Sequence, residues 1–331
     1  MPGPPAPRLA LTIGDPAGIG PEISLRAAAG ADAVLVGDRC VLEETARRLG
    51  LDIRIDSYKL EDLAGGFPAQ QAGHVRLLDT GILPRPVPPG KACAEGGRAA
   101  FRAIELAIEG AGSGVFHGVV TGPINKRAFA MAGIGFPGHT EIFAARTGTK
   151  NFAMLMYSEK IAVGLATCHQ PLRSVPDSLT TARLVEVGHL LDESVGRLLG
   201  RRPRIAVLGL NPHAGEEGLF GDEEERVIRP AIEWLQRDGI DAEGPLPPDT
   251  AFTPAALARY GAHLCLYHDQ GLIPFKALAF DTGVNVTMGI PFVRTSVDHG
   301  TAYDIAGKGT ADPASLRSAI AVARALLAHT V

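Results

Sequence analysis

The chain has few of the features that mark secreted, membrane or nucleic-acid-binding proteins. Its 331 residues include only four cysteines, which are far apart and form no CxxC pair: Cys40, Cys93, Cys168 and Cys265. They predict neither a disulfide framework nor a cysteine zinc site. No apolar run approaches the roughly 18 residues of a membrane span, and the proline-rich start lacks a signal-peptide core. These absences predict a cytoplasmic protein with reduced thiols.

Charge of one sign is also missing. The 32 Lys and Arg residues and 36 Asp and Glu residues give a net charge of −4, and no long run carries a single sign. This balance argues against binding to nucleic acid or to an anionic membrane, both of which require a basic surface. Small molecules are therefore the expected ligands. At about 150 residues per domain, the length predicts two domains.

Short apolar runs alternate with longer segments of helical period, which is the pattern of an α/β protein with a parallel sheet covered by helices. The expected strands are residues 9–13, 33–36, 118–121, 152–157, 161–167, 204–210 and 264–267. Helices are expected at residues 95–109 and 313–329, and the acidic run at residues 222–225 is expected to be a solvated first turn of another. Residues 63–97 are rich in Gly and Pro and predict a long irregular connection.

Three histidines follow the ends of predicted strands: His169, His213 and His268. The carboxyl ends of parallel strands share one edge of the sheet, so these side chains can converge although they are far apart in sequence. Three imidazole ligands with an open fourth position make a catalytic zinc site. One such histidine alone is more often a hydrogen-bonded strand-end residue, but the recurrence favours the metal. Asp249, in a proline-rich loop, is a further candidate, with a turn-forming or capping role equally open.

Two other segments suit an anion. Residues 136–141 begin a helix, whose free N–H groups can bind an anion while Thr140 caps the helix. Lys276, Asn285 and Arg294 lie nine residues apart in a loop-rich, glycine-containing segment and offer charge and donors to a phosphate. Solvated surface positions are the alternative for these side chains.

Near the start, residues 14–22 join the first strand to a helix. This turn is not a GxGxxG fingerprint, so a packing turn and a ligand-facing turn are equally open. Of the remaining histidines, five are assigned to surface or packing positions: His74, His117, His189, His263 and His329.

At this level of detail the chain resembles the 4-hydroxythreonine-4-phosphate dehydrogenase family, from about residue 9 to residue 328. The resemblance is carried by GDPAGIGPE at residues 14–22, TGPINK at 121–126, PGHTE at 137–141, NPHAGE at 211–216, YHDQG at 267–271 and the run at 285–309. Cys168 and Gln170, beside His169, depart from the pattern of many members.

The resemblance implies an isocitrate/isopropylmalate dehydrogenase-like fold, a two-domain α/β/α sandwich with its active site in the interdomain cleft. Residues 1–125 and 296–331 would form the nucleotide-side domain, and residues 126–295 the metal- and substrate-binding domain. It further implies a homodimer with the active site at the subunit interface, and NAD or NADP bound without a Rossmann fingerprint.

By the same resemblance, His169, His213 and His268 hold one divalent metal, zinc or alternatively cobalt or magnesium. With Asp249, the loop candidate named above, they are expected to form the catalytic group. The substrate-binding residues would be His139, Thr140, Lys276, Asn285 and Arg294. The cofactor-binding residues would be His299, Gly300, Thr301, Ala302, Asp304 and Ile305.

The implied reaction oxidises 4-phosphohydroxy-L-threonine by hydride transfer to the nicotinamide, and decarboxylation then yields 3-amino-2-oxopropyl phosphate. The metal would lower the pKa of the hydroxyl and stabilise the enolate that decarboxylation leaves. Family members that act on 4-phosphothreonate or 4-phosphoerythronate are alternatives, and a more distant branch oxidises aromatic dihydrodiols. Outside the family, a zinc hydrolase and a noncatalytic binding protein with a structural metal remain open.

Overall fold

The computed structural model describes residues 7–28 and 31–328, and these form two compact units. Unit 1 contains the described residues up to Thr149 together with Ile290–Leu327, and unit 2 contains Lys150–Gly289 and Ala328. Residues 126–149, which the sequence analysis grouped with the second domain, pack instead in unit 1. His329, assigned above to a surface or packing position, lies outside the described residues.

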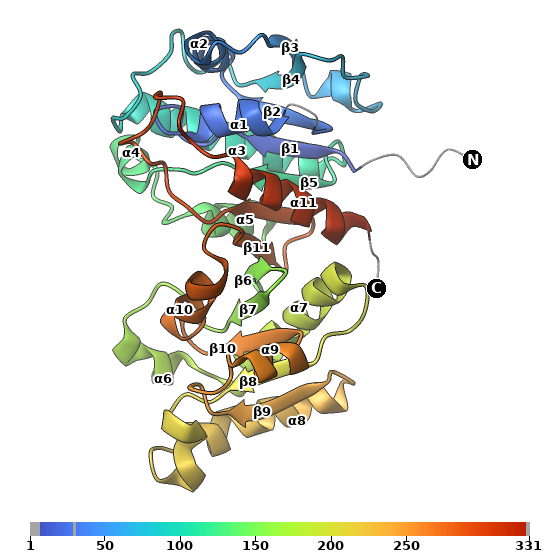
Figure 1. Ribbon diagram of the computed structural model, residues 1–331, viewed down its shortest axis with the longest axis vertical. Helices are drawn as coiled ribbons and strands as arrows, with labels where there is room; N and C mark the ends of the chain where they lie inside the picture. Colours follow the sequence, from blue (N-terminus) through green and yellow to red (C-terminus); the bar gives the residue numbers. More distant parts are fainter. Residues whose placement is uncertain (1–6, 29–30, 329–331) are drawn as a thin grey trace, which may run out of the picture. The chain divides into compact units, whose positions relative to one another are not determined.

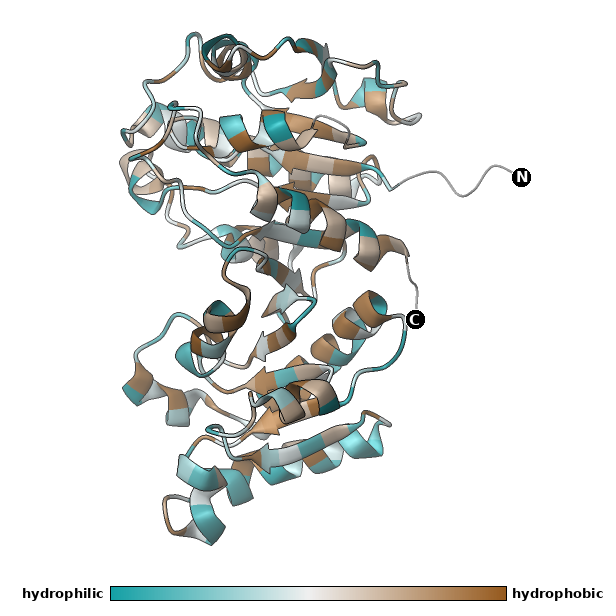
Figure 2. Cartoon of the chain, in the orientation of Figure 1, coloured by the Kyte–Doolittle hydropathy of each residue, from teal (hydrophilic) through white to brown (hydrophobic). Residues whose placement is uncertain are grey.

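Unit 1 is built on a parallel sheet with the strand order β3-β4-β2-β1-β5-β12. Its strands are β1 (Leu9–Thr12), β2 (Ala33–Gly37), β3 (Arg54–Tyr58), β4 (His74–Asp79), β5 (Gly118–Thr121) and β12 (Val293–Val297). Every residue of β1, β2 and β5 is buried, as expected of strands covered on both faces. Figure 2 shows the apolar colouring along these strands. The edge strand β3 is partly exposed.

The helices of unit 1 are α1 (Gly20–Ala28), α2 (Arg39–Leu49), α3 (Ala94–Gly112), α4 (Lys126–Met131), α5 (His139–Thr147) and α11 (Ala314–Ala328) (Figure 1). Cys93 caps α3 by accepting a hydrogen bond from Gly96, and the Asn125 side chain caps α4. Helices α3, α4 and α5 share one core with β1, β2 and β5, which explains why residues 126–149 belong to this unit.

Unit 2 is built on a mixed sheet with the strand order β11-β6-β7-β10-β8-β9. Its strands are β6 (Ala153–Ser158), β7 (Ile161–Leu165), β8 (Ile205–Leu208), β9 (Ala242–Leu246), β10 (Ala262–Cys265) and β11 (Val284–Met288). Strand β6 is antiparallel to both β7 and β11, whereas β7, β10, β8 and β9 are parallel. The carboxyl ends of β7, β10 and β8 therefore lie at one edge, the arrangement from which the histidine site was predicted.

Helices α10 (His268–Ala279) and α7 (Thr181–Leu199) pack on this sheet, and α8 (Arg229–Arg237) packs on β9 and α7. The smaller helices are α6 (Val175–Ser178) and α9 (Pro254–Arg259) (Figure 1). One core joins α10 to β6, β7, β8 and β10 through residues such as Val163, Leu165 and Phe275. No helix in the described ranges is both long and apolar enough to cross a membrane.

The structure corrects three expectations about local structure. Residues 63–97 are not irregular throughout, because β4 lies within them. Residues 284–297 are not a loop but the strands β11 and β12; Gly283, Gly289 and Pro291 mark the strand boundaries rather than a continuous loop. The acidic run is not simply a solvated turn, because Glu224 is buried and begins a π-helical turn, Glu224–Ile228, that leads into α8.

Candidate functional site

The predicted histidines lie at the carboxyl ends of three neighbouring strands of unit 2. His169 follows β7, His213 follows β8 and His268 is the first residue of α10, just after β10. The rings of His169 and His268 are close, with 5.6 Å between centroids and 43° between planes. Nδ1 of His268 lies 2.6 Å from a carboxylate oxygen of Asp269. Two of the three imidazoles are thus adjacent, whereas strand-end reasoning predicted that all three converge.

His213 lies in an unusual backbone segment. Residues 213–217 all have positive φ, between 45° and 83°, and four of these five residues are not glycine. Each such residue costs roughly 1–2 kcal/mol, because its Cβ approaches the backbone. Strain of this kind persists only where the surroundings impose it, and it concentrates at functional sites. The His213 side chain is 62% exposed, and its Nδ1 lies 3.2 Å from the Glu216 carboxylate.

A divalent metal matches the donor types but not the arrangement of these residues. Neutral imidazoles are the preferred zinc ligands. Across residues 7–28 and 31–328, however, no three His, Cys, Asp or Glu side chains are close enough together to hold a metal ion. Asp249 lies in an exposed turn after β9 and does not complete such a group. The described residues therefore do not form a metal centre as they stand.

In unit 1, Arg294 is a buried cation rather than the flexible surface residue that the sequence suggested. It lies on β12 with 1% exposure, its Nη2 donates to Thr121 Oγ1 at 2.7 Å, and its guanidinium lies over the Phe143 ring at 5.5 Å. Burial lowers the pKa of Arg294 to about 9, against an opposing contribution from the Glu141 carboxylate. A buried guanidinium is costly unless it binds an anion or another partner.

His139 lies beside this cation at the start of α5. The helix begins after Gly138, which provides no side-chain cap, so Thr140 lies in the first turn and is not the N-cap that the sequence suggested. Nε2 of His139 is buried and has no hydrogen-bond partner among the described residues. Burial lowers the pKa of His139 well below its usual value, and the positive charge of Arg294 lowers it further. A buried cation, an imidazole and a helix N-terminus together suit an anion such as phosphate.

The other two predicted substrate residues belong to unit 2. Lys276 lies on α10, where its Nζ is 5.2 Å from the centre of the Phe280 ring. Asn285 lies on β11, and its Oδ1 is buried without a hydrogen-bond partner among the described residues. Both are in regular elements, not in loops.

The predicted cofactor segment, residues 299–305, packs in unit 1 against the turn at residues 14–22. Ile19 N donates to Thr301 O at 3.0 Å, and a Cβ on Gly18 would come within 2.9 Å of Thr301, so glycine permits the close approach. The Tyr303 hydroxyl donates to the buried Asp15 carboxylate at 2.6 Å. Burial raises the pKa of Tyr303, and its hydrogen bond to Asp15 raises it further. The two motifs, far apart in sequence, therefore form one structural unit.

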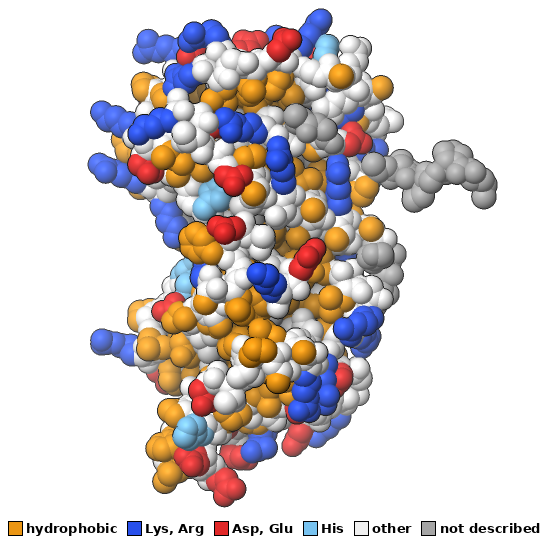
Figure 3. Space-filling model, viewed as in Figure 1, with side chains coloured by type: hydrophobic (Ala, Val, Ile, Leu, Met, Phe, Trp, Pro, Cys, Tyr) orange, Lys and Arg blue, Asp and Glu red, His pale blue; other side chains and the backbone are white. Residues whose placement is uncertain are grey.

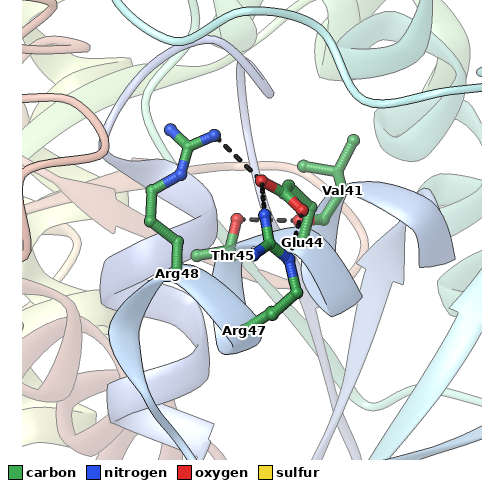
Figure 4. Close-up of polar contacts among 5 residues, drawn as sticks. All are labelled: Val41, Glu44, Thr45, Arg47 and Arg48. Atoms are coloured by element: carbon green, nitrogen blue, oxygen red, sulfur yellow. Dashed lines mark hydrogen bonds and ion pairs between the residues drawn. The ribbon is translucent and has the colours of Figure 1, made fainter.

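A small cavity of about 30 Å³ lies between α2 and residues in or next to these two motifs, among them Gly18 and Gly307. Arg48 lines it and approaches Gly307 so closely that a Cβ there would be 2.6 Å from Nη1. Figure 4 shows that Glu44 accepts hydrogen bonds from both Arg47 and Arg48, which lower the pKa of its carboxyl. Glu44 thus holds a cation beside the predicted cofactor segment.

The remaining described histidines have local partners, as their assignment to surface or packing positions implies. His74 contacts Asp56, His117 accepts from Arg8 N, His189 contacts Asp238, and the buried His263 contacts Ala251 O. On the face drawn in Figure 3, side chains of both charge signs occur in each unit. Sequence reasoning missed Thr121, Tyr303, Glu224 and Gln270, which act through contacts that have no local sequence signal.

Comparison with known proteins gives matches over nearly the whole chain. Residues 29–323 match the family described as pyridoxal phosphate biosynthetic protein PdxA. A 4-hydroxythreonine-4-phosphate dehydrogenase from Xanthobacter autotrophicus is 45% identical, covering 97% of this chain and 94% of its own. A D-threonate 4-phosphate dehydrogenase from Pectobacterium atrosepticum is 42% identical, covering 96% and 98%. The crystal structure of a 4-hydroxythreonine-4-phosphate dehydrogenase from Klebsiella pneumoniae matches with a TM-score of 0.87 and 38% identity, covering 97% and 99%.

Proposed function

Because the chain belongs to the PdxA family of pyridoxal phosphate biosynthetic proteins, we propose that it is a dehydrogenase acting on 4-phosphohydroxy-L-threonine. The carbon bearing the secondary hydroxyl loses a hydride to the nicotinamide ring, and the hydroxyl loses its proton, which leaves a ketone. The resulting β-keto acid loses CO2 and takes up a proton to give 3-amino-2-oxopropyl phosphate. The nicotinamide performs the redox chemistry, so the protein's task is to bind and orient the two reactants.

The observation that carries this proposal is the buried cation of unit 1. Arg294, on β12, offers a positive charge, and His139, at the N-terminus of α5, offers a hydrogen-bond donor beside it. A phosphate bound here would take the place of the water molecules that burial excludes from the Arg294 guanidinium. Thr140, in the first turn of the same helix, is a further proposed substrate contact. Lys276 and Asn285, in unit 2, stay predicted substrate residues. A substrate phosphate would offset the desolvation of the Arg294 guanidinium.

NAD or NADP binds to His299, Gly300, Thr301, Ala302, Asp304 and Ile305 in this proposal. Support comes from the way the turn at residues 14–22 fixes this segment, through the bonds from Ile19 N to Thr301 O and from Tyr303 to Asp15. Titration of the protein with each nucleotide, followed by fluorescence, tests whether both bind and which binds more tightly.

His169, His213 and His268 bind one divalent metal, zinc or alternatively cobalt or magnesium, with Asp249 as a further catalytic group. The adjacent rings of His169 and His268 support this assignment. His213 would have to move to join them, since its side chain is exposed and contacts Glu216. Metal analysis of protein purified without added metal tests it, because a three-histidine site should retain about one ion per chain.

The chain forms a homodimer with the active site at the subunit interface. Helix α10, which begins with His268, exposes large apolar side chains: Ile273 is 69% exposed and Phe280, just after the helix, 70%. A second copy covering this face would remove them from water. Sedimentation velocity at assay concentration tests this, and an active monomer would contradict it. The cytoplasmic location stays a prediction.

A second candidate substrate is 4-phosphothreonate, since a D-threonate 4-phosphate dehydrogenase is nearly as similar to this chain as the first relative. We therefore test 4-phosphohydroxy-L-threonine, 4-phosphothreonate and 4-phosphoerythronate with NAD and with NADP, comparing kcat/KM from the absorbance of the reduced nicotinamide. The highest kcat/KM identifies the substrate. Absence of nucleotide reduction with all three would overturn the proposed function.

A further inference from the structure

Four connections of unit 1 lie at one edge of its parallel sheet. They follow the strands β1, β4, β5 and β12 and comprise residues 13–19, 80–93, 122–125 and 298–313. Because these strands are parallel, the connections share the carboxyl edge of the sheet, where α/β proteins commonly bind their ligands. The predicted cofactor segment, residues 299–305, belongs to the last of them.

Direct contacts join the other connections to the cofactor segment. Gly90 N donates to Ala17 O at 2.7 Å, and a Cβ on Gly90 would lie 3.0 Å from Tyr303 O. The Asn125 side chain donates to Thr301 Oγ1 at 3.4 Å. The four connections therefore form one continuous surface.

Five exposed cations lie on these connections or directly after them, and we call them the cationic rim: Arg85, Lys91, Lys126, Arg127 and Lys308. Lys126 and Arg127 are the first residues of α4, and Lys308 lies three residues after the cofactor segment. Figure 3 shows Lys and Arg side chains along the part of unit 1 where α4 lies in Figure 1. Within the described part of the chain, none of the five side chains has a hydrogen bond, an ion pair or a ring contact.

Most other cations of unit 1 have partners. Ion pairs hold Arg26, Arg39, Arg47, Arg48, Arg54, Lys59, Arg76, Arg98 and Arg146. Hydrogen bonds hold Arg8, Arg294 and Arg317. Outside the rim, the described cations of this unit that lack both kinds of contact are Arg102 on α3 and Arg324 on α11. Unpaired positive charge is thus concentrated at the carboxyl edge.

Most carboxylates at this edge are engaged elsewhere. Asp15 is buried and accepts a hydrogen bond from the Tyr303 hydroxyl. Asp38 and Asp79 each accept hydrogen bonds from two backbone amides. Asp304 is exposed in the cofactor segment and is one acid against five cations. The rim therefore keeps an excess of positive charge, which a bound polyanion would offset.

We propose that the cationic rim binds the phosphate groups of the nicotinamide nucleotide. The inference rests on the proposed function, which places the nucleotide on residues 299–305. Lysine binds phosphate as a point charge, arginine binds it through two parallel hydrogen bonds, and a surface of one charge sign attracts oppositely charged ligands. NADP carries one phosphate more than NAD. The rim consequently strengthens the binding of NADP more than that of NAD.

Glutamine variants remove the charge and keep a polar side chain. Lys308→Gln removes one charge from the rim. Two double variants each remove two charges, Lys91→Gln with Lys308→Gln and Lys126→Gln with Arg127→Gln. Arg102→Gln is the matched control, because Arg102 also lacks a partner among the described residues but lies within α3 and not on a connection.

The first readout is the dissociation constant for NADPH and for NADH, measured by nucleotide fluorescence without substrate. We expect Kd for NADPH to rise about 1.5-fold to 5-fold for each cation removed, the range of exposed ion pairs. Kd for NADH should rise less, and Arg102→Gln should bind both nucleotides as the unmodified protein does.

Salt provides an independent measure of the same attraction. Raising the ionic strength from about 0.01 M to 1 M shortens the screening length from about 30 Å to 3 Å. NADPH binding to the unmodified protein should weaken over this range, and binding to the double variants should weaken less.

Folding stability and kcat separate nucleotide binding from a structural role. Removing like charges from one surface reduces their repulsion, so urea unfolding of the double variants should show an unchanged or higher free energy of unfolding. A structural role predicts the opposite. At saturating nucleotide kcat should not change, since contacts to the phosphates persist in the transition state.

The outcomes distinguish this inference from the proposed function. Unchanged NADPH affinity in both double variants would overturn the inference, as would an equal loss in Arg102→Gln or equal losses for NADPH and NADH. If the unmodified protein binds NADPH through the rim but oxidises none of the three phosphorylated substrates, the proposed function fails and the inference stands. Failure to bind either nucleotide would overturn both.

Discussion

Replacing Arg294 with methionine tests the phosphate site most directly. Methionine has a similar length but no charge, so it removes the guanidinium with little change in volume. A hydrogen bond to a charged group contributes about 1.5–3 kcal/mol, which corresponds to roughly a 10-fold to 150-fold change in affinity. The contact to phosphate exists in both the ground state and the transition state. We therefore expect KM to rise about 10-fold to 100-fold while kcat changes less.

The same variant should bind substrate more weakly without losing folding stability. Arg294 is 1% exposed, and burial lowers its pKa to about 9, so the folded protein holds this charge at a cost. Removing a buried charge recovers the free energy that its desolvation costs, and this gain opposes the loss of the hydrogen bond to Thr121. Urea unfolding should therefore show an unchanged or higher free energy of unfolding, and inorganic phosphate should no longer protect the variant.

Arg146→Met is the matched control, because Arg146 lies on α5 in the same unit and forms a half-exposed ion pair with Glu105 at 2.8 Å. Such pairs contribute about 0–1 kcal/mol, so KM should not change and stability should fall only slightly. An unchanged KM in Arg294→Met, or a loss of stability large enough to explain its kinetics, would refute the reasoning.

Three further predictions concern unit 1. Burial holds His139 neutral, so below about pH 6.5 the unfolded chain binds a proton that the folded chain does not. The free energy of unfolding should therefore fall as the pH drops below about 6.5. Urea titrations of His139→Gln should show a smaller fall. Gly97→Ala would place a Cβ 2.3 Å from Ala128 O, so calorimetry should show a loss of about 1–3 kcal/mol in the free energy of unfolding. Gly112 lies on the same helix with open space around it, so Gly112→Ala should show no such loss. Tyr303→Phe removes the hydroxyl that ties the cofactor segment to the turn at residues 14–22, so the KM for NAD(P) should rise. An unchanged KM for NAD(P) would contradict that role.

The sequence predicted buried strands such as β1, β2 and β8, because their continuous apolar runs are too short for a helix. It missed five others, β3, β4, β9, β11 and β12. In β11 and β12 polar residues alternate with β-branched ones between glycines and a proline. Local composition cannot distinguish such short strands from loops, since their pairing partners lie far away in sequence. Arg294 therefore looked like a surface residue, although pairing with β5 buries it.

The candidate site shows the same limit. Strand-end reasoning correctly located His169 and His268 near each other, because parallel strands place their carboxyl ends at one edge. It could not predict the left-handed backbone at His213, which depends on Glu224, eleven residues later, and on the space that Gly209 and Gly215 leave. Contacts of this kind arise only when the segments are folded together.

The discontinuity of unit 1 has a consequence for the order of events during synthesis. Nearly all of unit 2 is one stretch, Lys150–Gly289, which can fold as soon as it leaves the ribosome, whereas unit 1 waits for β12 and α11 from the end of the chain. Until then β5 keeps an open edge, with unpaired amides that could recruit another nascent chain. Arrival of β12 closes that edge and brings Arg294 with it, so completion of the sheet and delivery of the anion-binding cation are a single late step.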